Sequence, residues 1–193
     1  MAQSVRRRTI GSAFGVVIAV VGLATSSNAQ EIKSNNALDV TATEIRRLID
    51  LGANNPIKSI DDGRNTVFVW FETRKPGRSE GAVLHTRLTE VYTIVQGTAI
   101  LRTGGTLTEL RPLVIPGTLP GTDFPRFPSP SFSGKIVGGI SRRVNAGDVL
   151  VMPANTAHLW ESVDPPMLAY YIIRIDPDHV LHAGYANPAL TDK

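Results

Sequence analysis

From residue 57 to residue 176, the hydrophobic positions fall into short runs that are rich in Val, Ile, Tyr and Phe and are separated by Gly and Pro. Short runs of these residue types with this punctuation predict β-strands. The predicted strands are residues 65–73, 81–87, 90–96, 98–103, 141–144, 149–152, 157–163 and 167–175. Many short strands with little helix favour a β-sandwich or a β-barrel, so the expected fold class is all-β.

Two segments depart from the strand pattern. Residues 37–50 carry apolar side chains at near-helical spacing, Thr41 or Thr43 can cap their start, and Gly52 follows as a stop. This pattern predicts one short helix packed on the outside of the domain. Residues 106–139 contain six prolines and no predicted strand. They are expected to form a long proline-rich loop, either a semi-rigid flap or a disordered insertion.

The N-terminus has the pattern of a secretory signal peptide. Three arginines, Arg6 to Arg8, precede an uncharged apolar run over residues 10–23, and small residues follow at Ser27 and Ala29. This predicts cleavage after Ala29 and a periplasmic or secreted protein. A retained membrane anchor is disfavoured because the run has 14 residues, whereas a spanning helix needs roughly 20.

Charge and cysteine content narrow the classes of partner. The chain has 20 basic and 17 acidic residues, and three of the basic residues lie in the predicted signal peptide. The mature chain is therefore close to neutral, which gives no support for nucleic acid or an anionic membrane as a partner. The chain has no cysteine, which excludes disulfides and thiolate metal sites.

Strand alternation groups three side chains that suit a divalent metal. Alternate residues of a strand share a face, which groups Val83 with His85, Glu90 with Tyr92, and His158 with Trp160. If these faces point inward, two imidazoles and one carboxylate converge. His85, Glu90 and His158 would then bind Fe, Mn, Ni or Zn and leave coordination positions open. The alternative is a metal-free barrel in which both histidines are hydrogen-bonded.

Two stretches of the chain resemble the two sequence motifs of the cupin superfamily. Residues 77–97 read GRSEGAVLHTRLTEVYTIVQG and residues 147–162 read GDVLVMPANTAHLWES, each with the spacing of glycine and histidine found in that superfamily. The resemblance implies a cupin jelly-roll β-barrel over residues 57–176, similar to a group of exported bacterial cupins of largely unassigned function. The superfamily usually supplies three histidines and one glutamate, but Val83 stands here at the first histidine.

The remaining segments complete the expected domain organisation. Residues 1–29 form the signal peptide, residues 30–56 an N-terminal segment with the short helix, and residues 177–193 a C-terminal tail.

Three further residues are candidates for the site. Arg87 could neutralise an anionic ligand or face solvent, and Tyr92 could donate a proton or pack in the core. Trp160 could form a wall of the pocket or belong to the plain core.

Two classes of function follow from the resemblance and the candidate ligands. The first is a metal-dependent enzyme that acts on a small molecule by oxygenase, isomerase or lyase chemistry. The second is a non-catalytic barrel that binds a small ligand or a metal. A homodimer formed through sheet edges is a further expectation from the resemblance.

Overall fold

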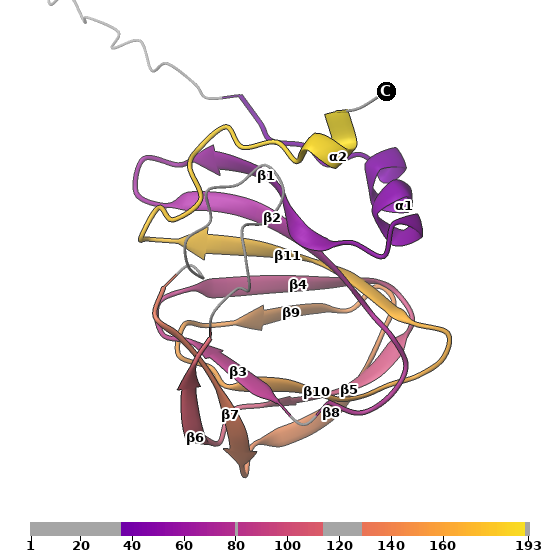
Figure 1. Ribbon diagram of the computed structural model, residues 1–193, viewed down its shortest axis with the longest axis vertical. Coiled ribbons are helices and arrows are strands. Elements are labelled where there is room, and N and C mark those ends of the chain that lie inside the picture. Colours follow the sequence, from indigo (N-terminus) through magenta and orange to yellow (C-terminus); the bar gives the residue numbers. More distant parts are fainter. Residues whose placement is uncertain (1–35, 80, 114–128, 192–193) are drawn as a thin grey trace, which may run out of the picture. The chain divides into compact units, whose positions relative to one another are not determined.

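The computed structural model describes residues 36–79, 81–113 and 129–191. The predicted signal peptide and the middle of the proline-rich segment lie outside these ranges. Within the described residues the structure has eleven strands and two helices, and the described residues from Ala37 onward form one compact unit (Figure 1). Among the same residues, no helix is long and apolar enough to cross a membrane.

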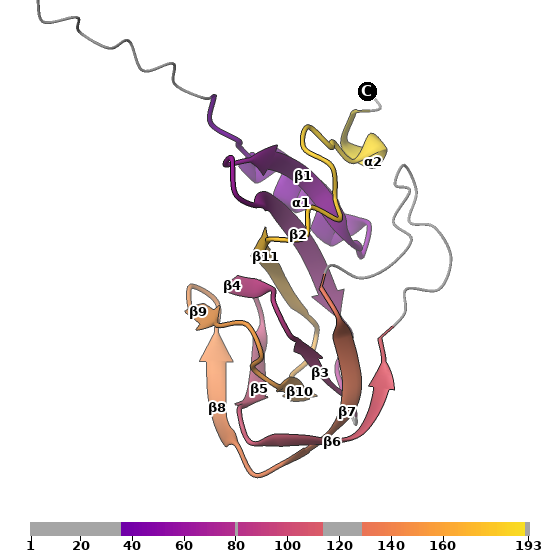
Figure 2. The same ribbon diagram turned by 90° about the vertical axis from the view of Figure 1, so that its left-hand side faces the viewer.

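The strands form two antiparallel sheets rather than one closed barrel (Figure 2). In spatial order the first sheet contains β1 (Asn54–Asp61), β2 (Thr66–Arg74), β11 (Leu168–Asp176), β4 (Thr89–Gln96) and β9 (Val149–Met152). The second contains β6 (Thr106–Pro112), β7 (Ser131–Val137), β3 (Ala82–His85), β10 (His158–Val163), β5 (Thr98–Thr103) and β8 (Ile140–Asn145). Residues of both sheets share one apolar core, so the two sheets pack face to face as a jelly roll.

All eight predicted strands are present, and three further strands were missed. The expectation of a loop over residues 106–139 is wrong at both ends, because β6 and β7 pair with each other there. Prolines suggested a loop, but Pro112 ends a strand at the edge of its sheet, where the missing N–H is tolerated. Strand β1 was missed because Pro56 interrupts its pattern, and the register shifts between Pro56 and Lys58.

The predicted N-terminal helix is confirmed as α1 (Ala42–Asp50). Thr41 is its N-cap, and Thr41 and Glu44 exchange side-chain and backbone hydrogen bonds as a capping box. Leu48 is buried against residues of the first sheet, including Ile57 and Phe71. The helix therefore covers the outer face of that sheet, beside β1 and β2 in Figure 1.

The C-terminal segment is packed onto the domain rather than trailing from it. Leu181 and Tyr185 are buried in the main core. The backbone N–H of Tyr185 donates to the hydroxyl of Ser59 on β1. A second short helix, α2 (Pro188–Thr191), follows.

The inward-facing residues of the first sheet form layers along its strands. One layer joins Phe68, Arg174, Glu90 and Met152, which are direct neighbours across four strands and are all buried. The next layer is mainly apolar and aromatic and contains Trp70, Ile172, Tyr92 and Leu150. A third layer pairs Tyr170 with Glu72 and Ile94. Two buried carboxylates therefore lie on either side of an aromatic layer.

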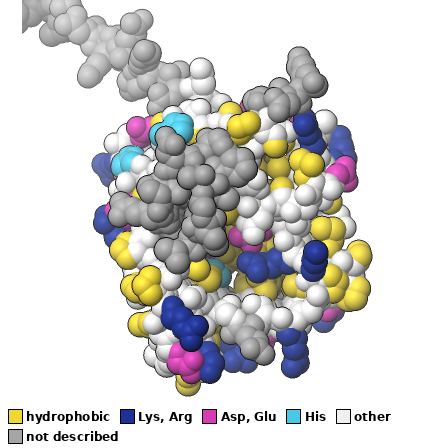
Figure 3. Space-filling model, viewed as in Figure 1, with side chains coloured by type: hydrophobic (Ala, Val, Ile, Leu, Met, Phe, Trp, Pro, Cys, Tyr) yellow, Lys and Arg dark blue, Asp and Glu magenta, His cyan; other side chains and the backbone are white. Residues whose placement is uncertain are grey.

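Charged side chains on the outside do not form one block of a single sign. On the face drawn in Figure 3, Lys and Arg side chains are scattered and acidic side chains lie among them.

Candidate metal centre

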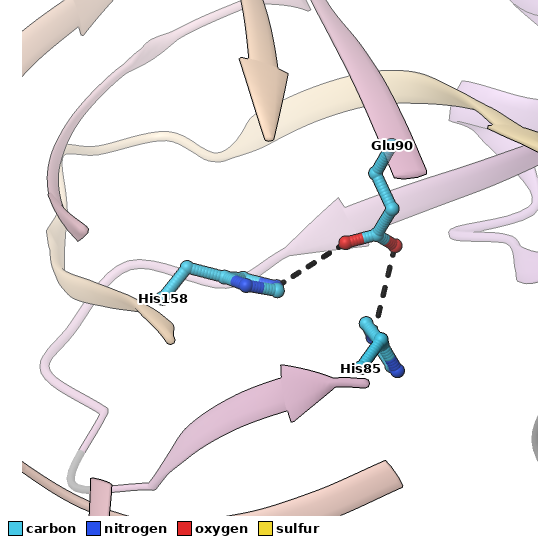
Figure 4. Close-up of side chains that lie close together, drawn as sticks. All are labelled: His85, Glu90 and His158. Carbon is cyan, nitrogen blue, oxygen red and sulfur yellow. Dashed lines mark ion pairs between the residues drawn. The ribbon is translucent and has the colours of Figure 1, made fainter. Parts of the chain in front are cut away.

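His85, Glu90 and His158 come together inside the domain from three different strands. His85 ends β3, Glu90 lies on β4 in the opposite sheet, and His158 begins β10. One ligand atom from each lies within 4.8 Å of the others, and the three residues are 3%, 1% and 4% exposed. Figure 4 shows both imidazoles turned toward the carboxylate. The structure thus brings together the three residues that the sequence grouped.

The outer nitrogen of each imidazole is held by a hydrogen bond. Nδ1 of His158 lies 3.1 Å from the carbonyl oxygen of Thr156, which can only accept, so this nitrogen carries the proton. Nδ1 of His85 lies 2.7 Å from the hydroxyl of Ser131, and that hydroxyl donates to the carbonyl of Ser129. The Ser131 oxygen therefore accepts from His85. In a neutral imidazole, both Nε2 atoms are left with a lone pair.

The Nε2 atoms of both imidazoles face the same carboxylate. Nε2 of His85 lies 3.7 Å from Oε1 of Glu90, and Nε2 of His158 lies 3.6 Å from Oε2. Lone pairs and a negative carboxylate repel one another at such distances unless a positive charge lies between them. A metal ion would supply that charge for both imidazoles, whereas the hydroxyl proton of Tyr92 can serve only Nε2 of His158.

Arg174 neutralises the carboxylate from the other side. Its Nε donates to Oε1 of Glu90 over 2.8 Å, and both side chains are buried. The guanidinium carbon lies 4.5 Å from the ring centroid of Trp70, which stabilises the cation further. A buried carboxylate is costly without such a partner.

The pKa shifts follow from burial and from this charge pair. Burial lowers the pKa of His85 to about 3 against the attraction of Glu90. Burial raises the pKa of Glu90, but His85 and the charge and hydrogen bond of Arg174 outweigh it and lower that pKa to about 2. At neutral pH His85 is therefore neutral, and Arg174 is the group that keeps Glu90 ionised.

Tyr92 belongs to the site. Its hydroxyl lies 3.3 Å from Oε2 of Glu90 and 3.1 Å from Nε2 of His158. Burial, and then the negative charge of Glu90, raise the pKa of Tyr92 well above its ordinary value. The hydroxyl therefore keeps its proton at neutral pH and can donate it to the carboxylate, to the imidazole or to a bound ligand.

Trp160 and Arg87 lie further away. Trp160 stacks on Tyr92 with ring centroids 6.2 Å apart, and its Nε1 donates to the hydroxyl of Tyr170. It therefore forms the layer beneath the site. Arg87 does not join the site, because β3 ends at His85 and the exposed guanidinium pairs with Asp178 over 2.6 Å.

The three ligand atoms fit a divalent metal after a small contraction. A metal about 2.1 Å from each ligand cannot have two of them more than about 4.2 Å apart, so the group must close by several tenths of an ångström. Val83, which replaces the expected histidine, is the direct neighbour of His158 across β3 and β10. Its apolar side chain supplies no ligand, so the set found among the described residues consists of two nitrogens and one carboxylate.

Arg174, Ser131 and Thr156 were not predicted from the sequence. The sequence does indicate that Arg174 faces inward. It is the one charged residue in the run from residue 167 to residue 175, and it shares a face with Tyr170 and Ile172. Ser131 lies in the segment that was expected to be a loop. Its role depends on the pairing of β3 with β7.

The fold is a jelly roll of two antiparallel sheets, and the buried His–Glu–His group in its interior fits a divalent metal. The sequence itself matches no family model and no curated protein.

Several solved structures are similar to this chain at low sequence identity. A Bacillus halodurans protein is 15% identical, with 77% of this chain and 87% of that chain covered and a TM-score of 0.44. A cupin protein from Bacteroides fragilis is 12% identical, with 84% and 97% covered and a TM-score of 0.39. A Klebsiella pneumoniae protein with a double-stranded β-helix domain is 15% identical, with 67% and 88% covered and a TM-score of 0.39. Such distant likeness carries over neither a substrate nor a reaction.

Proposed function

We propose that this protein binds a divalent metal through His85, Glu90 and His158 and acts on a small molecule at that metal. The observation that carries the proposal is the pair of Nε2 lone pairs directed at one buried carboxylate, 3.7 and 3.6 Å away. Hydrogen bonds to Nδ1 fix both imidazoles in the form that ligates a metal through Nε2. Fe, Mn, Ni and Zn all accept such a ligand set.

The proposed reaction is an oxygenation, an isomerisation or a lyase step, as the cupin resemblance implies. A bound metal would polarise or activate the small molecule as a Lewis acid. Tyr92 would donate a hydrogen bond or its proton to that molecule, since its hydroxyl adjoins both Glu90 and His158. Arg174 holds the carboxylate in place, and the aromatic layer beneath the site excludes water from this side.

Elemental analysis of the purified mature protein, before any metal is added, tests the proposal. We expect about one divalent metal per chain in the wild type, almost none in His158→Ala, and a folded protein by circular dichroism in both. His182→Ala is the matched control, because His182 is exposed and lies outside the ligand group. Full metal occupancy in His158→Ala would refute the assigned ligands.

A metal-free binding barrel is the second candidate, and one observation favours it. Arg174 already neutralises Glu90, so the buried carboxylate is electrically compensated without a metal. Wild-type protein that remains metal-free after dialysis against each of the four metals, yet unfolds cooperatively, would favour this candidate over the first.

We also propose that the protein is exported, on the basis of the arginine, apolar and small-residue pattern of residues 1–29. N-terminal sequencing of material from the periplasm or the medium should begin at or near Gln30. Protein in those fractions that still begins at Met1 or Ala2 would exclude cleavage.

A further inference from the structure

A cavity of about 280 Å³ lies on the far side of the aromatic layer from the metal centre. Its lining comes from residues 73–79, which end β2 and lead toward β3, and from Trp160 and Val163 of β10. Trp160 stacks on Tyr92, and the hydroxyl of Tyr92 adjoins His158, so this layer separates the cavity from the metal centre. Binding cavities typically measure roughly 300–1,000 Å³, so this one suits a small molecule.

Hydrogen bonds to the two sheets hold the wall of the cavity in place. The backbone N–H of Gly77 donates to the carbonyl of Val163 over 3.1 Å, and that of Val163 donates back over 2.8 Å. Nε of Arg74 donates to the hydroxyl of Tyr170, and Nη2 donates to Glu72, each over 2.9 Å. These bonds use two of the five N–H donors of an arginine. Because the side chain of Arg74 lines the cavity and is 41% exposed, its other donors can reach a ligand there.

Three cations line the cavity, and its described lining residues include no acid. Arg74 is paired with Glu72. Lys75 and Arg78 are exposed, and within the described part of the chain neither has an acidic partner. The planar guanidinium of an arginine matches the oxygens of a carboxylate or a phosphate and binds them in a bidentate manner. The lining therefore favours an oxyanion.

The two acids that neighbour the cavity residues of β10 in sequence pair with other cations. Glu161 pairs with Arg102 of β5, and Asp164 pairs with Arg143 of β8. Both of these arginines lie outside the lining of the cavity. Neither carboxylate is therefore placed to compete with a ligand for the cations of the cavity.

We propose that this cavity binds a small organic oxyanion, either a carboxylate or a phosphate monoester. Arg74 and Arg78 bind the anionic group, and Lys75 adds to the attraction. Trp160 and Val163, which are 4% and 7% exposed, contact the apolar part of the ligand. The site is independent of the proposed metal binding, because none of its described lining residues is a candidate metal ligand.

Tryptophan fluorescence should report binding, because Trp160 lines the cavity and the chain has one other tryptophan, Trp70. The experiment titrates benzoate, phenyl phosphate and benzamide into mature protein that a chelator has freed of metal. Benzamide keeps the ring and lacks the charge. We expect a saturable change with benzoate or phenyl phosphate and none with benzamide at the same concentrations. The oxyanion that binds more tightly identifies the class of ligand.

Variants of the cavity cations locate the bound anion. The double variant Lys75→Gln, Arg78→Gln should weaken binding by at least about tenfold, because it removes charge-assisted hydrogen bonds. Arg74→Met should weaken binding by at least as much, since it removes the donors that are held in place. Arg64→Gln is the matched control and should bind as the wild type does, because Arg64 is an exposed cation outside the cavity. Circular dichroism checks that each variant is folded.

Three results would overturn the oxyanion site. The first is no response to either anion, or benzamide binding as tight as theirs. The second is undiminished anion affinity in both the double variant and Arg74→Met. The third is loss of the response in His158→Ala, which would place the anion at the metal centre. Because the protein is free of metal throughout, failure of the proposed metal binding would leave these results unaffected.

Discussion

Two of the buried carboxylates, Glu72 and Glu90, lie on either side of the aromatic layer, and the groups around them differ in one respect. Glu72 accepts from the hydroxyl of Tyr170 and pairs with Arg74 over 2.9 Å. Glu90 likewise has a tyrosine hydroxyl and an arginine, but two imidazoles also face it. One arginine and one hydroxyl are thus enough to hold a buried carboxylate in this fold. The histidines are an addition that the burial of an acid does not require, which points to binding rather than stability.

The exposure of the arginine is the second difference between the Glu72 end and the Glu90 end of the interior. The side chain of Arg74 is 41% exposed, whereas that of Arg174 is 3% exposed. Water can replace Arg74 beside Glu72, but it has little access to Glu90. The same pair of residue types should therefore contribute very different amounts to stability at the two ends.

The largest expected effect is the difference in stability loss between variants of the two arginines. Arg174→Met leaves a buried carboxylate without its partner, and we expect the free energy of unfolding to fall by about 3–5 kcal/mol in metal-free protein. Arg74→Met should lower it by about 1 kcal/mol or less. Urea unfolding followed by tryptophan fluorescence measures both. Equal losses of unfolding free energy in the two variants would mean that burial does not make the arginine beside Glu90 more important than the one beside Glu72.

The three ligand residues could be predicted because their information is local. The spacing from His85 to Glu90 and strand alternation place their faces from sequence alone. The partner of Glu90 could not be predicted in this way, since Arg174 is 84 residues away and meets it through the register of β11 on β4. An inward arginine in an apolar strand was visible, but which acid it neutralises depends on tertiary pairing.

The errors outside the site have a similar cause. Strands β6 and β7 contain few alternating apolar residues, and prolines lie around them, so their local pattern indicated a loop. Pairing with β3 makes β7 a strand, and it positions Ser131 beside His85. The hydrogen bond from Ser131 that orients His85 could therefore not be predicted, because Ser131 lies in the segment that was expected to be a loop.

Loss of the hydrogen bond between Ser131 and His85 should have an intermediate effect. It should lower the metal affinity of the site around Glu90. Ser131→Ala removes the acceptor for Nδ1 of His85, so the imidazole is less firmly held with Nε2 toward the site. Loss of an outer partner of a metal ligand typically lowers metal affinity by about 10–100-fold. Isothermal titration with Zn(II) should detect this loss. Ser133→Ala, two residues along the same strand, is the control and should bind Zn(II) as the wild type does.

The most gradual expected effect is a pH dependence of stability that comes from His85. His85 has a pKa of about 3 when folded, against about 6.5 for an unperturbed histidine. Between these values the unfolded chain binds a proton that the folded protein does not. Stability of the metal-free protein should therefore fall as the pH drops below about 6.5, by up to about 1.4 kcal/mol per pH unit.

A second loss should follow at lower pH. The folded pKa of Glu90 is about 2, below the value of 4.5 for an unperturbed glutamate, so its contribution is lost as the pH falls through this interval. Replacement of His85 by Gln should flatten the first slope, between about pH 6.5 and 4.5, and leave the second in place. Glu72→Gln should keep the first slope, because no histidine lies at that end. Urea midpoints measured across this range would contradict the assignment if His85→Gln and the wild type lost stability in parallel, since the proton would then be taken up elsewhere.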